Sequence, residues 1–221
     1  MPSFHPRVQD LPADFPVFPL PGALLLPRGR LPLNIFEPRY LAMTEDALGA
    51  GRMFGMIQPD PALPEDGNGP GLYRIGCLGR LTAFSETDDG RFLITLTGVI
   101  RFTVAEELPL RRGYRRVRGD FSAFHPDLDL SARQTGVERD ALLAALRSYF
   151  QRRNFEPNWE TIRKMPDDLL VVTLSMVCPF EPVEKQALLE AGSDADRAAA
   201  LLALLQMGAA EPGGSPGHTV T

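Results

Sequence analysis

The chain of 221 residues is long enough for one large domain or two small ones, and its 44% hydrophobic residues can supply a buried core. A net charge of −5 keeps such a chain soluble and argues against a dedicated nucleic-acid binder. Cys77 and Cys178 lie far apart, without a Cys-x-x-Cys motif or a nearby histidine. This excludes a disulfide scaffold and a cysteine-rich zinc site, and it favours a reducing compartment.

The sequence shows no targeting or membrane segment. Residues 1–14 lack the apolar core of a signal peptide. The two most apolar runs, Leu169–Phe180 and Ala198–Ala210, are shorter than the roughly 18 residues that a transmembrane helix needs, and both contain polar residues. We therefore expect a cytoplasmic protein that makes no membrane contact.

Short strands are expected in the first half of the chain. Most of the 21 prolines lie there, and they disfavour helix because each ring removes an N–H donor. Asp88-Asp89-Gly90 is a turn signal that predicts a β-hairpin, and Gly98 predicts a bulge or sharp bend. Several short strands joined by Gly and Pro turns indicate a small barrel or sandwich. The expected strands cover residues 15–18, 31–36, 52–57, 78–86, 91–98, 99–104 and 114–121.

One helix interrupts these strands. Pro38 suits a first helical position, so the pattern predicts a helix over Arg39–Leu48 that ends at Gly49 or Gly51. The polar Pro/Gly/Asp segment Gln58–Leu72 is expected to be a long mobile loop.

From about Ser131 the apolar period becomes helical, which predicts a compact helical bundle. Ser193 suits an N-cap, and Gly208 suits a helix end. The ending 211–221 has little to bury and is expected to be disordered. The expected helices cover Val137–Phe150, Asp167–Cys178, Pro182–Ala191 and Asp194–Met207.

The motifs of common enzymes are missing. Neither Lys164 nor Lys185 follows a glycine, which excludes a P-loop, and no Gly-x-Ser-x-Gly elbow occurs. Three scattered histidines support neither a metal site nor a catalytic triad. Three pairs of adjacent carboxylates have structural roles instead of catalytic ones, at a turn, a strand end and a helix start: Asp88-Asp89, Glu106-Glu107 and Asp167-Asp168. We therefore expect no catalytic, cofactor-binding or metal-binding residues.

A cluster of basic residues around one tyrosine offers a nucleic-acid alternative. Such a cluster can follow a phosphate backbone and stack a base. The favoured interpretation is a solvated face of an edge strand, where charge blocks aggregation. The cluster consists of Arg111, Arg112, Tyr114, Arg115, Arg116 and Arg118.

Several motifs follow one another in a fixed order along the chain: Phe15–Pro27 (FPVFPLPGALLLP), Leu31–Tyr40 (LPLNIFEPRY), Phe54–Ile57 (FGMI), Ile75–Gly79 (IGCLG), Asp89–Arg91 (DGR), Leu96–Phe102 (LTGVIRF) and Lys185–Glu190 (KQALLE). Together, over about residues 13 to 207, they resemble the N-terminal domain of Lon proteases.

The resemblance implies an α+β fold in which a PUA-like pseudo-β-barrel (13–123) precedes a C-terminal helical bundle (131–208) and a disordered tail (209–221). In that family the domain precedes an AAA+ ATPase and a Ser-Lys protease, and it is implicated in recognising substrate polypeptides. This sequence has neither the P-loop nor a protease segment. It therefore resembles the stand-alone Lon-domain proteins of bacteria, and we expect no enzymatic activity and no cofactor.

The resemblance leads to the hypothesis of a non-catalytic module that binds unfolded or extended polypeptide. Such a module would act as an adaptor or regulator in protein quality control, beside a protease or chaperone. A sheet edge and an apolar groove between barrel and bundle would hold the chain. RNA binding through the basic cluster is the alternative, and a small-molecule enzyme ranks third. The candidate polypeptide-binding residues are Phe36, Glu37, Arg39, Tyr40, Phe54 and Met56.

The same residues have structural explanations. We expect Phe36, Tyr40 and Met43 to fill the space between the helix and the barrel. Glu37 and Arg39 are expected to order the helix entrance through a charge contact or a cap.

Overall fold

The computed structural model describes residues 6–131, 136 and 138–210. They fall into two compact units, one within Met1–Ala132 and Val172–Glu190, the other within Arg133–Val171 and Ala191–Thr221. The proposed boundaries at 13–123 and 131–208 stay predictions. Residues 211–221 of the expected tail lie outside the described residues, whereas 209 and 210 end a helix.

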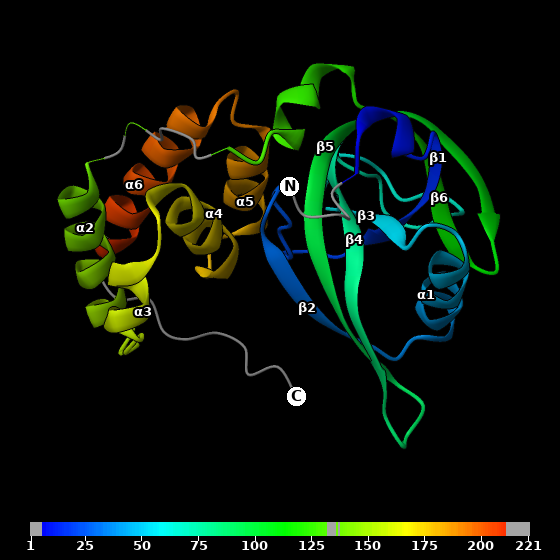
Figure 1. Cartoon of the computed structure of the whole chain (residues 1–221), viewed down its shortest axis with the longest axis horizontal. Helices are drawn as coiled ribbons and strands as arrows, with labels where there is room; N and C mark the ends of the chain where they lie inside the picture. Colours follow the sequence, from blue (N-terminus) through cyan, green and yellow to red (C-terminus); the bar gives the residue numbers. More distant parts are fainter. Residues whose placement is uncertain (1–5, 132–135, 137, 211–221) are drawn as a thin grey trace. The chain divides into compact units, whose positions relative to one another are not determined.

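The first unit is built on a ring of strands that closes on itself (Figure 1). The ring runs β5–β4–β3–β1–β6 and returns to β5, and β2 pairs with β5 outside it. The β1–β3 pair is parallel, and the other pairs are antiparallel. The strands are β1 (Asp14–Pro19), β2 (Arg30–Ile35), β3 (Met53–Ile57), β4 (Ile75–Glu86), β5 (Phe92–Arg111) and β6 (Tyr114–Asp120).

Strand β5 makes the ring possible because it is 20 residues long and pairs with three strands. The expectation of two strands, 91–98 and 99–104, is therefore wrong, since one strand covers both. The irregularity expected at Gly98 is confirmed: the β4–β5 register shifts there, so that Gly98 faces Gly79 and Ile100 faces Leu78. The hairpin expected at Asp88-Asp89-Gly90 also forms, and Gly90 has φ of +76°.

The inside of the ring is an apolar core. Its aromatic centre is Phe15 against Phe102, with ring centroids 4.9 Å apart. A Cβ on Gly98 would lie 1.9 Å from the Leu26 carbonyl oxygen, so only glycine permits this close approach of two backbones. The buried members of this core are Phe15, Val17, Ile57, Leu72, Leu78, Val99, Ile100, Phe102 and Val117.

Helix α1 (Pro38–Gly49) lies against β1, β3 and β6 and begins at Pro38 as predicted. Two short 3-10 helices, η1 (Val8–Asp10) and η2 (Ser122–Leu128), had no counterpart among the predicted elements. The segment 58–72 contains no helix or strand, but bridges pair Pro59 with Leu72 and Asp66 with Gly69. Its mobility stays a prediction.

The C-terminal half is helical, as predicted, with small differences at the helix ends. The helices are α2 (Arg139–Arg152), α3 (Trp159–Lys164), α4 (Asp167–Val177), α5 (Pro182–Glu190) and α6 (Asp194–Ala210). Val137, the expected first residue of α2, lies outside the described residues. Helix α3 was not predicted, because six residues are too short for a clear apolar period.

The predicted N-cap of α6 is confirmed, and its predicted end is wrong. The Ser193 hydroxyl accepts a hydrogen bond from the Asp196 N–H at 3.1 Å. Helix α6 passes through Gly208 to Ala210. A Cβ on Gly208 would meet the Tyr149 ring at 2.7 Å, so this glycine serves the close packing of α6 on α2 instead of ending the helix.

Helix α5 belongs to the first unit because buried polar contacts hold it to the strands. The Gln58 side chain donates to the Pro182 carbonyl and to the Gln186 side chain, at 3.0 and 3.1 Å. Gln186 in turn donates to the Ile75 carbonyl of β4 at 3.1 Å, and Lys185 donates to the Gly22 carbonyl at 2.7 Å. Burial lowers the pKa of the Lys185 ammonium from its ordinary 10.5.

Candidate functional site

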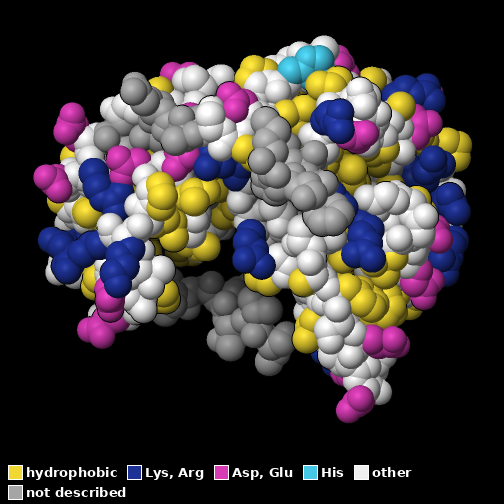
Figure 2. Space-filling model, in the orientation of Figure 1, with side chains coloured by type: hydrophobic (Ala, Val, Ile, Leu, Met, Phe, Trp, Pro, Cys, Tyr) yellow, Lys and Arg dark blue, Asp and Glu magenta, His cyan; other side chains and the backbone are white. Residues whose placement is uncertain are grey.

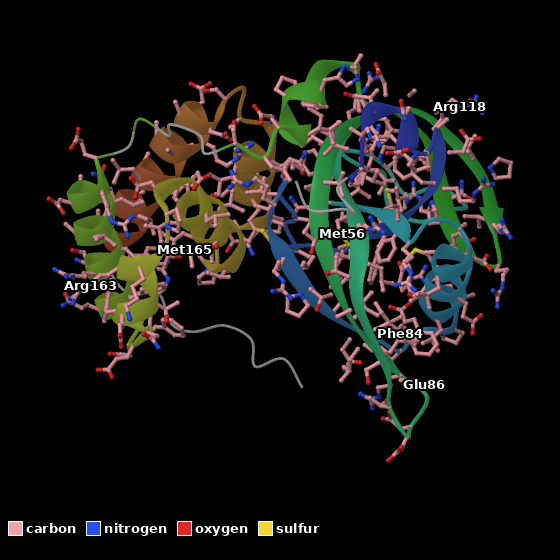
Figure 3. All side chains as sticks on the ribbon, viewed as in Figure 1. Met56, Phe84, Glu86, Arg118, Arg163 and Met165 are labelled. Atoms are coloured by element: carbon pink, nitrogen blue, oxygen red, sulfur yellow. The ribbon has the colours of Figure 1, made fainter. Side chains whose placement is uncertain are left out.

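Three of the six candidate polypeptide-binding residues, Tyr40, Phe54 and Met56, are buried. Phe54 and Met56 belong to β3, which has a strand on each side, and both are buried. Gly55 and Ile57 face the interior of the ring, so Phe54 and Met56 (labelled in Figure 3) lie on the opposite face of β3, against which α1 lies. A polypeptide on the surface cannot reach these two side chains, so the expectation that they line an exposed groove does not hold.

The residues around the start of α1 divide between surface and interior. Tyr40 and Met43 are buried as expected, and the Tyr40 ring packs on Phe18 with centroids 4.0 Å apart. Phe36 is 62% exposed, so the expectation that it packs between helix and barrel is wrong. Ile35, the last residue of β2, is buried; Phe36 follows it and points the other way.

Glu37 and Arg39 order the entrance of α1 through a charge contact. Their side chains approach to 2.9 Å, and both are about half exposed. Glu37 is the N-cap residue but makes no side-chain capping hydrogen bond. The Arg39 guanidinium also lies 4.6 Å from the centre of the Tyr40 ring, in a cation–π contact.

The basic cluster around Tyr114 is largely neutralised by carboxylates. Arg112 contacts Glu45 and Asp46 of α1 at 2.8 and 2.9 Å, and Arg111 contacts Asp46 at 3.3 Å. Arg118 (labelled in Figure 3) lies between Asp14 and Glu106, at 2.9 and 2.8 Å. Arg115 is buried and contacts Glu107 at 2.6 Å. Guanidinium groups in such pairs are poorly placed to follow a phosphate backbone.

Tyr114 is held by the same acidic residue of α1. Its hydroxyl donates to the Asp46 carboxylate at 2.6 Å. Burial, together with this hydrogen bond, raises the pKa of Tyr114 to about 12. The same hydrogen bond lowers the pKa of the Asp46 carboxyl, and Arg112 adds to that effect.

One small cavity brings together residues of both predicted sets. Arg39 and Tyr40, from the polypeptide set, and Tyr114 and Arg115, from the basic cluster, line a cavity of about 150 Å³. Its remaining walls come from prolines and from the 68–70 turn.

A three-stranded arm carries the exposed apolar surface of the first unit. We define the arm as β2, residues 82–86 of β4 and residues 92–97 of β5, which pair with one another except at Thr82, where the β4–β5 register shifts. In Figure 1 the β4–β5 hairpin projects beyond the ring of strands. Figure 2 shows hydrophobic side chains exposed where the arm leaves the ring, and acidic side chains toward its tip. Figure 3 labels Phe84 and Glu86 there.

Leu93 and Phe84 are the exposed apolar residues of the arm, at 47% and 41%. Leu93 lies in a shallow hollow of about 530 Å³, which strands β2, β4 and β5 all line. Around it, Pro32 and Asn34 of β2 and Ala83 and Ser85 of β4 share its face of the sheet.

The arm has two outer edges of different character. On the β2 side, Pro32 supplies no N–H donor and blunts the edge. On the other side, β3 pairs with β4 only up to Arg80. Among the described residues no strand lies beside Thr82–Glu86, which contains no proline, so this edge is open.

The sequence already carried a signal for the arm. Around Leu93 both alternating faces contain apolar residues, with Phe92, Ile94 and Leu96 on the face opposite to Leu93. A strand that covers a core on one side needs only one apolar face. A leucine on the solvent-facing side therefore adds apolar surface that is available to a ligand.

Metal chemistry and membrane insertion find no support in the residues that the structure describes. No group of three or more His, Cys, Asp or Glu side chains there could hold a metal ion. None of the described helices has the length and apolar character needed to cross a membrane.

Comparison with known proteins identifies relatives along most of the chain. The family model described as the substrate-binding domain of ATP-dependent protease La (LON) matches residues 14–207. The Lon protease of Anaeromyxobacter dehalogenans is 28% identical over 98 residues, which are 44% of this chain and 12% of that protein. The Lon protease of Dictyoglomus thermophilum is 25% identical over 174 residues, 78% of this chain and 20% of that protein. The chain thus spans a fifth or less of the length of these curated relatives.

Two solved structures share the fold. A Lon N-terminal domain protein from Xanthomonas campestris matches with a TM-score of 0.60 and 21% identity, over 86% of this chain and 97% of that one. The N-terminal domain of the Mycobacterium avium complex Lon protease matches with a TM-score of 0.57 and 16% identity, over 90% and 98%. These matches confirm the predicted α+β fold with a pseudo-barrel. With residues 14–207 matched and the fold shared, the chain belongs to the family of Lon substrate-binding domains.

Proposed function

We propose that the chain binds unfolded or extended polypeptide through the arm, without catalysing a reaction. The observation that carries this proposal is the exposed apolar face around Leu93, next to the open edge of β4. Membership of a substrate-binding family supports the same ligand class. Such a module would act as an adaptor or regulator in protein quality control, presenting polypeptides to a protease or chaperone.

The arm offers two complementary interactions to an extended chain. Main-chain N–H and C=O groups along Thr82–Glu86 can pair with an added strand, which gives affinity for any sequence. The hollow around Leu93 can take apolar side chains, which selects chains that expose them. Folded proteins expose fewer unpaired strands and fewer apolar side chains than unfolded ones, so the arm would discriminate against them.

Acidic residues at the tip of the arm favour polypeptides that carry basic residues. Glu86, Asp88 and Asp89 lie exposed at the end of the hairpin. A bound chain with basic residues beside its apolar segment would gain a modest, salt-dependent attraction. Cys77 and Cys178 are both buried thiols, which suits a reducing compartment such as the cytoplasm, where we propose that the protein works.

The arrangement of the basic cluster argues against RNA binding. Four of the five arginines that RNA binding would need, Arg111, Arg112, Arg115 and Arg118, are paired with carboxylates, and those contacts would have to break before phosphates could bind. The affinity for RNA would therefore be reduced by the free energy needed to break these ion pairs.

A fluorescence-polarisation titration of a labelled, permanently unfolded protein tests the proposal. We expect saturable binding in the micromolar range that high salt weakens little. Leu93→Ser should weaken it about tenfold, because an exposed leucine that becomes buried contributes about 1.5 kcal/mol or more. Leu110→Ser is the matched control, since Leu110 is 44% exposed on the same strand but lies outside the arm.

Two results would reject the proposal. One is the absence of saturable binding by the natural chain. The other is an equal loss of affinity in the Leu93→Ser and Leu110→Ser variants, which would show that the arm has no special part in binding.

A further inference from the structure

We propose that the cavity between the start of α1, the 68–70 turn and β6 is an anchoring pocket for one apolar residue of a polypeptide, whose main-chain carbonyl accepts hydrogen bonds there. The inference rests on the proposed function, since it names a second contact for the same ligand class. It differs in its site, because none of the cavity's lining residues belongs to the arm.

The walls of the cavity suit an apolar side chain. They are formed largely by four prolines and two tyrosines, Pro19, Pro21, Pro59, Pro70, Tyr40 and Tyr114. Proline and tyrosine rings present flat hydrocarbon faces, and aromatic-lined surfaces of this kind bind extended peptide segments. The volume of about 150 Å³ matches a single ring-sized side chain, so one residue enters and its neighbours stay outside.

One buried donor of a residue that lines the cavity has no partner among the described residues. Arg115 is 6% exposed, and its Nη1 and Nη2 donate to the Pro70 carbonyl and to Glu107, both at 2.6 Å. Its Nε–H, also buried, has no acceptor within the described part of the chain. The Tyr40 side chain also lines the cavity, and burial raises the pKa of its hydroxyl, which is therefore a donor at neutral pH. A buried donor without an acceptor is costly, so a ligand oxygen at this place is stabilising.

The charges around the cavity favour a neutral acceptor over an anion. Glu107 already balances Arg115, and Glu37 balances Arg39 at 2.9 Å. A carboxylate entering the cavity would meet these two acids as well as the arginines. A main-chain carbonyl can accept from the unpaired Arg115 Nε–H without adding charge, which points to an internal apolar residue of a polypeptide as the occupant.

The probe for this site is N-acetyl-phenylalaninamide, which carries one apolar side chain and neutral carbonyls. We expect saturable binding in about the millimolar range, as for a small ligand of this size. In nitrogen-15 NMR spectra the backbone signals of Gly69 and Gly113 and the Nε–H signal of Arg115 should shift together. N-acetyl-phenylalanine, with a free carboxylate, should bind no more tightly than the amide.

Asn68→Trp tests the location, because Asn68 lines the cavity from an exposed turn and a large ring there would fill the space. We expect this variant to lose at least about tenfold in affinity for the probe. Glu65→Trp is the matched control, since Glu65 lies exposed on the same loop and does not line the cavity. Tyr40→Phe, which removes only the hydroxyl, should weaken binding by a smaller factor while the protein stays folded.

Three results would overturn the inference: no shifts up to the solubility limit of the probe, shifts that persist in Asn68→Trp, or a free acid that binds at least tenfold more tightly than the amide. The unfolded-protein titration separates this failure from that of the proposed function. If Leu93→Ser weakens that binding while Asn68→Trp leaves both binding assays unchanged, the pocket fails and the arm stands. If the probe binds the pocket but the unfolded protein does not bind at all, the proposed function fails.

Discussion

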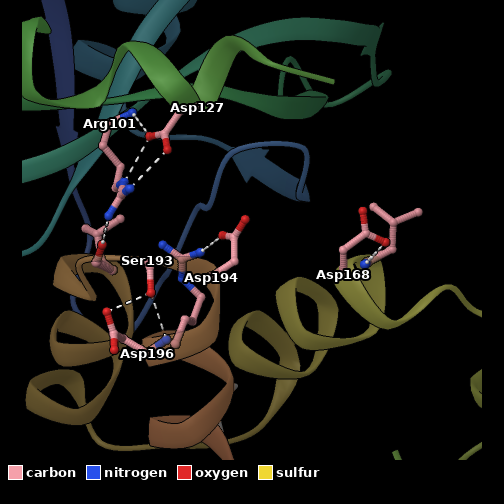
Figure 4. A network of polar contacts seen from close by, with 9 residues as sticks. Arg101, Asp127, Asp168, Ser193, Asp194 and Asp196 are labelled. Atoms are coloured by element: carbon pink, nitrogen blue, oxygen red, sulfur yellow. Dashed lines mark hydrogen bonds and ion pairs between the residues drawn. The ribbon is translucent and has the colours of Figure 1, made fainter. Parts of the chain in front are cut away.

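Arg101 and Asp127 form a buried two-point ion pair that joins β5 to η2 (Figure 4). The Arg101 Nε lies 2.9 Å from Asp127 Oδ2, and its Nη2 lies 3.0 Å from Oδ1. The remaining guanidinium nitrogen, Nη1, donates to the Leu189 carbonyl at 3.2 Å. The Arg101 side chain therefore links the ring of strands to η2 and to the end of α5.

Removal of the acid should destabilise the first unit strongly. Asp127→Ala removes the two-point carboxylate contact of a buried arginine, for which we expect a loss of about 3–5 kcal/mol in the free energy of unfolding. Urea denaturation followed by circular dichroism measures it. Asp88→Ala is the control, because Asp88 is exposed and the effect should stay within about 0.5 kcal/mol. Equal denaturation midpoints for Asp127→Ala and the natural chain would contradict a structural role for the pair.

This pair shows where the sequence was informative and where it was not. Arg101 lies in the motif Leu96–Phe102 that carried the resemblance, but the motif alone gave it no role. Asp127 lies in η2, a short 3-10 helix without apolar periodicity, and no pattern connects it to a strand that lies 26 positions earlier. Long-range polar partners of this kind depend on the fold and cannot be derived from local spacing.

Gly98 should tolerate no side chain. A Cβ there would lie 1.9 Å from the Leu26 carbonyl oxygen and 2.7 Å from the carbonyl carbon, so the two backbones would have to separate. The hydrogen bond from Arg28 N–H to the Gly98 carbonyl, at 2.9 Å, would be strained as well. We expect Gly98→Ala to cost about 3 kcal/mol or more in the free energy of unfolding, measured in urea.

Gly49→Ala provides the opposite case. Gly49 ends α1, and a Cβ on it would meet nothing within 4 Å. Alanine has the higher helix propensity, so this variant should be as stable as the natural chain or up to about 1 kcal/mol more stable. If Gly98→Ala matched Gly49→Ala, the close approach of the Leu26 backbone would have no energetic consequence.

Strand positions were more predictable than the side to which each residue points. Alternation correctly predicted the β4–β5 hairpin and the start of α1 followed from Pro38. Phe54 and Met56 are in β3, where a ring interior on one side and covering elements on the other bury both faces. Alternation alone cannot distinguish such a strand from one with a solvent-exposed face.

Tyr114 should titrate well above an ordinary tyrosine. Burial and the hydrogen bond to Asp46 raise its pKa from 10.0 to about 12. Phenolate absorbance should therefore show a late component that Tyr114→Phe reduces, beside the contributions of Tyr40 and Tyr73, whose pKa values burial also raises. Asp46→Asn should move this component toward lower pH, because the charge that opposes ionisation is lost, whereas Glu45→Gln should leave it in place. An unchanged late component in Asp46→Asn would mean that burial alone sets the pKa.

The raised pKa of Tyr114 also determines how the free energy of unfolding changes at high pH. The unfolded chain releases the Tyr114 proton near pH 10, whereas the folded chain holds it to about pH 12. The stability that Tyr114 contributes is fully present below pH 10 and is lost as the pH rises through 12. We therefore expect the urea midpoint to fall more steeply over this window in the natural chain than in Tyr114→Phe.

Pro32 should protect the outer edge of β2 from pairing with other strands. It is exposed, lies opposite Thr95 and removes one N–H from an edge that no other described strand covers. Pro32→Val supplies that N–H and a β-branched side chain, so we expect concentration-dependent self-association beyond that of the natural chain, measured by analytical ultracentrifugation. Pro32→Lys supplies the same N–H with a charge and should associate no more than the natural chain, because charges on an edge oppose strand pairing. If Pro32→Val sediments as the natural chain does, the proline is not what keeps this edge unpaired. If both variants associate equally, the added N–H alone causes the association and the charge does not oppose it.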